Sequence, residues 1–147
     1  MKEQTGNLKK AKELLSGGYT VVMCRDGEIY TSSERGVKPL VDLLKENRVM
    51  TGFSAADKIV GRAAAFLYVL LGVTEVYAEV MSEGAEKLLR GHNIEPSCGC
   101  LAEKIINRAG TGICPMENAV MDIPDESPDR ALSEIICTIS RLAADKK

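Results

Sequence analysis

The sequence is poor in aromatic residues, in histidine and in long apolar runs. Its 147 residues include no Trp, two Phe, four Tyr and one His. So few rings are not enough for a surface on which single-stranded bases stack. The longest apolar run, residues 59–73, is interrupted by Arg62 and is shorter than the roughly 18 residues that cross a membrane. These absences disfavour single-strand binding and membrane insertion.

Neither sign of charge dominates, and no targeting segment is visible. Lys and Arg number 19 against 21 Asp and Glu, so the net charge of -2 provides no basic surface for nucleic acid or anionic lipid. Residues 1–18 are polar and lack the apolar centre of a secretory signal. Five cysteines, an odd number, predict reduced thiols rather than a disulfide framework. We expect a cytoplasmic domain without nucleic-acid or membrane partners.

What is present is an alternation of helix-like and strand-like segments. Asp26-Gly27 between two β-branched stretches predicts a hairpin. Residues 54–72 are apolar on nearly every face from Ile59 onward, which predicts a buried central helix. The remaining periodicity predicts strands at 19–23 and 74–81 and helices at 8–15, 36–47, 82–90 and from Ser127 onward, with 94–100 ambiguous. This order indicates one α/β domain over residues 1–147.

A glycine-rich turn precedes a predicted helix start in GTGICPME, residues 110–117. Pro115 suits the first helical turn and Glu117 lies where a capping box places its acid, so Cys114 would be the N-cap. A thiol there is expected to have a lowered pKa, and the free backbone N–H groups could hold a phosphate or carboxylate. The alternative is a turn whose cysteine is merely small and buried. The ligand-binding residues expected around this turn are Arg108, Gly110, Thr111, Gly112 and Glu117.

Two opposite charges are adjacent in SAADK, at the start of the predicted central helix. A buried charge must be paired, capped or offered to a ligand. In one interpretation Ser54 or Asp57 is the helix N-cap and Lys58 extends to water. In the other, Asp57 and Lys58 face a pocket, with Lys58 as a cation or proton donor and Asp57 as its orienting partner. Arg62, one turn further on, could join them.

Potential metal ligands are poorly spaced. Cys98-Gly99-Cys100 lacks the two-residue spacer of most zinc knuckles, and the single histidine, His92, lies in an apparent helix exit. We interpret Cys24 and Cys137 as unreactive small hydrophobic residues within or beside core segments. We therefore expect no metal and no cofactor.

Two segments, FSAADKIVGRAAAFLYVLLGVTEVYAEVMSEGAEKLL and NRAGTGICPMENAV, resemble a family of small bacterial and archaeal domains of unknown function with a cytidine-deaminase-like fold. The resemblance covers approximately residues 8–141. It implies an α/β fold, a three-layer α-β-α sandwich with a mixed central sheet, which agrees with the order of elements above.

The resemblance does not imply deamination. A zinc deaminase needs a ligand next to a catalytic Glu, as in H-x-E, and the two further ligands of P-C-x-x-C. Here His92 is followed by Asn93 and Ile94, and no C-x-x-C occurs. Asp57 and Lys58 stand approximately where the first motif would start, and Ser82 where the second would begin. We therefore expect these residues and the Cys114 turn to line a metal-free pocket.

Three functions are compatible with these features. The first is binding of a small anionic or nucleotide-like molecule; if the protein is catalytic, Cys114 is the nucleophile and Lys58 the acid or cation. The second is thiol redox chemistry or sulfur transfer through Cys114, with Cys98 or Cys100 as resolving thiol. The third is a non-catalytic regulatory or scaffold role, in which the chain could form a homo-oligomer.

Overall fold

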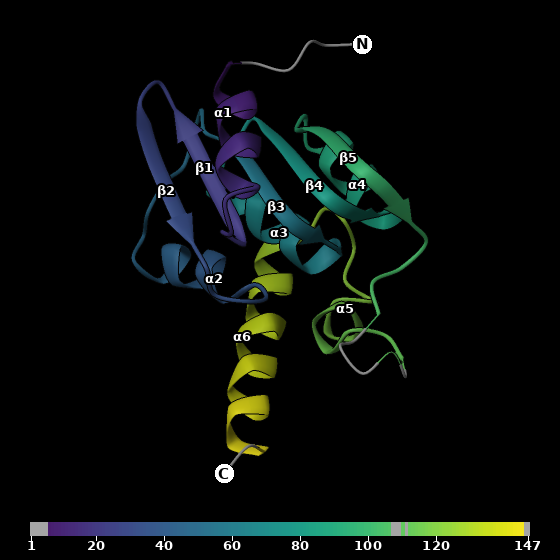
Figure 1. Cartoon of the computed structure of the whole chain (residues 1–147). Helices are drawn as coiled ribbons and strands as arrows, with labels where there is room; N and C mark the ends of the chain where they lie inside the picture. The colour runs from purple at the N-terminus through teal and green to yellow at the C-terminus, as the bar shows by residue number, and fades with distance from the viewer. Residues whose placement is uncertain (1–5, 107–109, 111, 146–147) are drawn as a thin grey trace.

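A five-stranded mixed sheet forms the middle of the molecule (Figure 1). The computed structural model describes residues 6–106, 110 and 112–145. The strand order is β2-β1-β3-β4-β5. β1 is antiparallel to both β2 and β3, whereas β3, β4 and β5 are parallel. The strands are β1 (Val21–Arg25), β2 (Glu28–Ser32), β3 (Ser54–Val60), β4 (Glu75–Ser82) and β5 (Glu95–Ala102).

Helices cover both faces of this sheet. On one face α1 (Gly6–Leu15) packs Ala11 and Leu15 against Val22 and Ala56. On the other face lie α2 (Lys38–Lys45), α3 (Arg62–Leu71), α4 (Glu83–Gly91) and α6 (Pro128–Asp145), whose apolar side chains form the larger core. A short helix, α5 (Pro115–Ala119), packs against α6. The predicted three-layer α-β-α sandwich with a mixed sheet is confirmed.

The prediction of one helix over residues 54–72 is wrong in its first part. Ser54–Val60 is the central strand β3, and the helix begins only at Arg62, after Gly61. A parallel strand that is covered on both faces is apolar on both, so its sequence shows no alternation and cannot be distinguished locally from a buried helix. The helix that follows is buried as expected, with Phe66 and Leu67 fully inaccessible.

Several local predictions are confirmed. Asp26 and Gly27 have φ of 46° and 94°, the left-handed conformations that a tight hairpin turn needs at both central positions. The C-terminal helix α6 begins at Pro128, and the ambiguous segment 94–100 belongs to the edge strand β5. Within the described part of the chain, no helix combines the length and apolarity needed to cross a bilayer.

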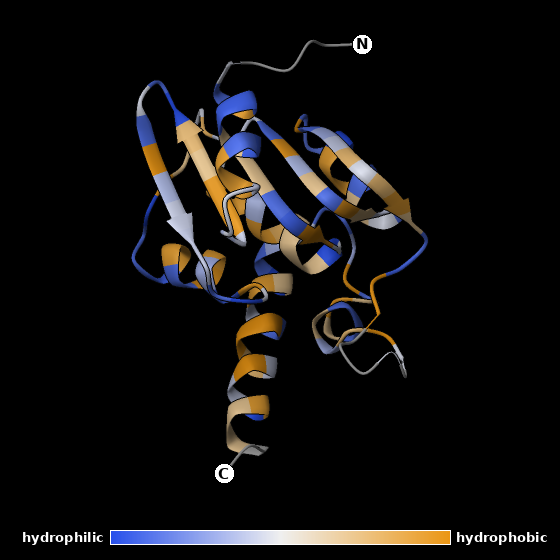
Figure 2. Cartoon of the chain, in the orientation of Figure 1, coloured by the Kyte–Doolittle hydropathy of each residue, from blue (hydrophilic) through white to orange (hydrophobic). Residues whose placement is uncertain are grey.

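Helix α6 extends beyond the body of the molecule. Figure 1 shows its C-terminal half projecting past the sheet, and Figure 2 shows hydrophobic residues along that half. Ile139 and Leu142 on this part of the helix are half-buried. Because the projecting part lies opposite α5 and the start of α2, its apolar side chains form one side of a cavity.

Candidate functional site

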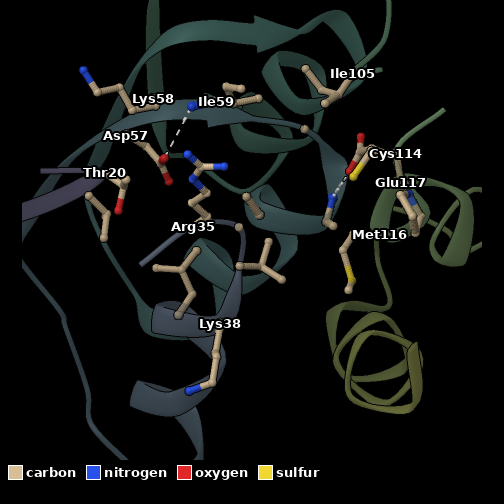
Figure 3. A pocket seen from close by; sticks show the side chains of 18 of the residues that line it. Thr20, Arg35, Lys38, Asp57, Lys58, Ile59, Ile105, Cys114, Met116 and Glu117 are labelled. Atoms are coloured by element: carbon tan, nitrogen blue, oxygen red, sulfur yellow. Dashed lines mark hydrogen bonds between the residues drawn. The ribbon is translucent and has the colours of Figure 1, made fainter. Parts of the chain in front are cut away.

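A cavity of about 660 Å³ lies beside the C-terminal end of β3 (Figure 3). Its walls come from β3, the first turn of α3, the segment leading into α2, the α5 region and the projecting part of α6. Four of the residues singled out from the sequence line it, namely Asp57, Lys58, Cys114 and Glu117. Residues that are far apart in the chain therefore share one cavity, although their contacts differ from those predicted.

Asp57 is a half-buried acid that lines this cavity. Its side chain lies on the α3 side of β3, where the Tyr68 hydroxyl donates a hydrogen bond to Oδ2 at 2.6 Å. The other oxygen, Oδ1, accepts a long 3.4 Å bond from the Ile59 backbone N–H. Burial raises the pKa of Asp57 to about 7, although the bonds from Tyr68 and from backbone N–H groups act to lower it. The carboxyl can therefore gain or lose a proton near neutral pH.

The same contact affects Tyr68. Tyr68 is fully buried in α3, and burial together with the adjacent Asp57 carboxyl raises the pKa of its hydroxyl well above the ordinary value. The hydroxyl therefore stays protonated and remains a hydrogen-bond donor to Asp57. Tyr68 was not identified from the sequence, because nothing local in a continuous apolar stretch shows that its hydroxyl meets a carboxyl on a neighbouring strand.

Lys58 does not have the partner that was predicted. Successive side chains of a strand point to opposite faces, so Lys58 lies on the α1 side of the sheet and Asp57 on the α3 side. The Lys58 ammonium pairs with Glu79 at 3.1 Å, and Figure 3 shows its side chain pointing away from the cavity. The hypothesis that Asp57 orients Lys58 is therefore wrong. The alternative is right that Lys58 extends toward the surface. It is wrong that Ser54 or Asp57 caps a helix, since both lie in β3 and the N-cap of α3 is Gly61.

Arg35 is a cation that the sequence analysis missed. It is exposed, lines the cavity just before α2, and has no ion pair or hydrogen bond with the described residues. Thr20 links the backbone next to Arg35 to β3, because the Thr20 hydroxyl donates to the Glu34 carbonyl at 2.5 Å while the Thr20 carbonyl accepts from the Lys58 N–H at 3.2 Å. In Figure 3 the guanidinium lies at the same end of the cavity as Asp57. No motif marks Arg35; only the tertiary structure does.

The capping box predicted around Cys114 does not form. Cys114 occupies the N-cap position of α5, but its side chain makes no capping hydrogen bond. Glu117 instead caps a different helix, since its carboxylate accepts from the N–H of Arg62 at 2.7 Å and of Ala63 at 2.8 Å. Helix α5 has only five residues, so few peptide dipoles point at the Cys114 thiol. The Cys114 thiol borders the cavity next to Glu117 (Figure 3).

Arg62 does not join Asp57 and Lys58. Its guanidinium donates to the carbonyls of Val120 at 2.7 Å and Ile123 at 2.6 Å, and pairs with Asp125 at 2.7 Å. It also lies over the Phe66 ring, 5.0 Å from the ring centre. Arg62 therefore ties the segment after α5 to α3 and keeps one wall of the cavity in place.

Three further predicted site residues, Ser82, Gly110 and Gly112, lie elsewhere. Ser82 is the N-cap of α4, where its hydroxyl accepts from the Ala85 N–H at 3.1 Å, and it borders a separate hollow of about 150 Å³. Gly110 and Gly112 are exposed and do not line the cavity. Arg108 and Thr111 lie outside the described residues.

The other cysteines and the histidine are separate from this cavity. Cys98 and Cys100 lie on β5 and do not line the cavity that Cys114 borders. Burial, and secondarily the Glu86 carboxylate, raise the pKa of Cys98, which disfavours its thiolate. The His92 Nε2 atom lies 2.7 Å from the Asp125 carbonyl. Among the described residues, no group of three or more His, Cys, Asp or Glu could hold a metal ion.

Comparison with known proteins identifies the family. The model of a domain of unknown function, DUF1893, matches residues 9–135. The chain belongs to the DUF1893 family. A crystal structure of a DUF1893 family protein from Thermotoga maritima matches with a TM-score of 0.78 and 25% identity, covering 95% of this chain and 92% of that one. No curated protein matches the chain.

A dCMP deaminase from the cyanophage S-TIM5, in apo form, matches with a TM-score of 0.42 and 16% identity, covering 63% of this chain and 93% of the deaminase. The DUF1893 assignment confirms the family that the two sequence segments resemble. The three-layer α-β-α sandwich which that resemblance implies is thus the fold of this DUF1893 domain.

In this DUF1893 domain the Glu117 cap depends on Gly61. A Cβ atom at position 61 would collide with the Glu117 carboxylate. We expect Gly61→Ala to displace that carboxylate from the N-terminus of α3 and to lower the free energy of unfolding by about 1–2 kcal/mol, the usual value of a lost cap. Urea unfolding followed by circular dichroism measures this loss.

The matched control is Gly91→Ala at the end of α4, where an added Cβ meets no atom within 4 Å. That variant should unfold at the same urea concentration as the wild type or slightly above it, because alanine favours helix. Equal stability of Gly61→Ala and Gly91→Ala would contradict the close approach of Glu117 to Gly61.

Proposed function

We propose that this DUF1893 domain binds a small molecule carrying an anionic group, such as a small acid or a nucleotide-like molecule, in the cavity beside β3. One observation carries the proposal: a half-buried carboxyl, Asp57, and the exposed guanidinium of Arg35 line the same cavity of about 660 Å³. Cavities of about 300–1,000 Å³ with mostly apolar walls and a few converging polar groups are typical of small-molecule sites.

The two polar groups have distinct roles in this proposal. The planar guanidinium of Arg35 binds the anionic group, because it donates parallel hydrogen bonds to carboxylate or phosphate oxygens. Asp57 accepts a hydrogen bond from the ligand when ionised and donates one when protonated. If the bound molecule reacts, Asp57 is better placed than Lys58 to transfer a proton, because the Lys58 ammonium pairs with Glu79 outside the cavity. Cys114 lies near Glu117 in another part of the wall and is the nucleophile available to such a reaction.

The proposal is tested by thermal denaturation with a panel of carboxylates, sugar phosphates, nucleobases and nucleotides. A ligand at about 100 times its Kd stabilises the folded state by about 2.7 kcal/mol, which raises Tm by several degrees. We expect a hit whose effect is lost in Arg35→Gln and kept in Lys87→Ala, the matched control that removes an exposed cation from a residue that does not line the cavity. The proposal fails if no compound raises Tm, or if a hit is unaffected by both Arg35→Gln and Asp57→Asn.

A further inference from the structure

The polar end of the cavity presents two groups of opposite charge. Thr20 connects their segments, since its hydroxyl bonds to the residue before Arg35 and its carbonyl bonds to the residue after Asp57. Arg35 has no hydrogen bond or ion pair with the described residues, and none of the described cations pairs with the Asp57 carboxylate, whose partners there are the Tyr68 hydroxyl and backbone N–H groups. A ligand with a single charge would pair with one of these groups and leave the other without an opposite charge.

Much of the remaining wall is aliphatic, although Lys38, Cys114 and Glu117 also line the cavity. No aromatic side chain of the described residues lines the cavity. A nucleobase would therefore find no ring on which to stack, whereas an aliphatic body would be well covered. The aliphatic side chains of the wall include Val37, Leu40, Ala63, Ala64, Ile139 and Leu142.

From this juxtaposition we infer that the ligand is a zwitterion with an aliphatic body, the chemical class of the larger aliphatic α-amino acids and short peptides made from them. Its carboxylate binds the Arg35 guanidinium, its ammonium group binds the Asp57 carboxylate, and its side chain packs along α2, α3 and α6. The inference rests on the proposed function and narrows its ligand class.

The experiment compares leucine with two analogues that each lack one of its charges. Binding of L-leucine, 4-methylpentanoate and 3-methylbutylamine to the full chain is measured by calorimetry at pH 8, with AMP and inorganic phosphate in parallel. Because all three organic probes have similar aliphatic bodies, their differences report on the carboxylate and the ammonium group. We expect leucine to bind at least about tenfold more tightly than either analogue, the size of one charge-assisted hydrogen bond.

Two variants show which residue binds each charged group of the ligand. In Arg35→Gln the preference for leucine over the amine should disappear, and in Asp57→Asn the preference for leucine over the acid should disappear. Equal binding of leucine and 4-methylpentanoate overturns the inference, as does binding of AMP or phosphate but not leucine; in both cases the proposed function survives. If neither these probes nor the wider panel of acids and nucleotides binds, the proposed function fails together with the inference.

Discussion

At pH 8 the Asp57→Asn variant is expected to be more stable than the wild type by up to about 4 kcal/mol, whereas at pH 4 the two should be nearly equal. The pKa of Asp57 is raised from 3.8 to about 7 by burial. Each unit of difference between the folded and unfolded pKa is worth about 1.4 kcal/mol, and the raised value spans roughly three units. Asparagine resembles the protonated acid and can still accept the hydrogen bond from Tyr68.

The direction of this pH dependence follows from the linkage between folding and proton binding. Because the folded state holds the proton more tightly than the unfolded state, the stabilising contribution of neutral Asp57 is fully present below about pH 4. It is lost as the pH rises through about 7, where the buried carboxyl ionises. The wild type should therefore lose stability relative to the variant throughout this interval, and above pH 7 the difference should level off.

Urea unfolding of both proteins at pH 4, 6 and 8 measures the difference directly, because the contributions of the other ionisable groups cancel. Asp122→Asn is the matched control, since Asp122 is exposed. The difference in free energy of unfolding between Asp122→Asn and the wild type should not increase between pH 4 and pH 8 as it does for Asp57→Asn. A constant difference in the free energy of unfolding between Asp57→Asn and the wild type at all three pH values would show that folding does not raise the pKa of Asp57.

Replacing Arg62 by alanine is expected to lower the free energy of unfolding by about 3 kcal/mol. The Arg62 side chain is only 20% exposed and binds two backbone carbonyls and the Asp125 carboxylate. Its removal leaves the Val120 and Ile123 carbonyls without their donor and the Asp125 carboxylate without its cation. Leaving half-buried partners unsatisfied costs about 1–3 kcal/mol per group and about 3–5 kcal/mol for a broken buried ion pair.

The loss should be accompanied by local loosening, because Arg62 ties the segment that follows α5 to α3. Hydrogen exchange of the amides in residues 115–125 should accelerate in Arg62→Ala more than exchange in the sheet. Arg62→Lys should have an intermediate effect, since an ammonium group cannot reproduce the forked geometry of a guanidinium.

Arg90→Ala serves as the surface control. Its partner Glu86 lies one turn away at 3.9 Å, and both side chains are partly exposed, so a loss below about 0.5 kcal/mol is expected. A similar small loss in Arg62→Ala, with unchanged exchange in residues 115–125, would contradict the structural role of Arg62.

Local chemistry in the sequence determined several elements and several of the cavity residues. Asp26-Gly27 predicts the hairpin because both residues tolerate positive φ, and Pro128 marks the start of α6 because its fixed φ suits a first helical turn. Asp57 and Cys114 were identified from sequence because a charge next to an apolar stretch and a cysteine before a helix-starting proline are visible in a short window. Both residues line the cavity.

The partners of these residues were decided by the tertiary structure. Glu117 caps a helix that begins 55 residues earlier, rather than its own, because a close approach at Gly61 makes that helix N-terminus reachable. Asp57 and Lys58 point apart because SAADKIV is a strand, and a strand covered on both faces has the same apolar composition as a buried helix. Arg35 and Tyr68 carry no local signal, since their importance comes only from side chains brought beside them by the packing of α2 and α3 against the sheet.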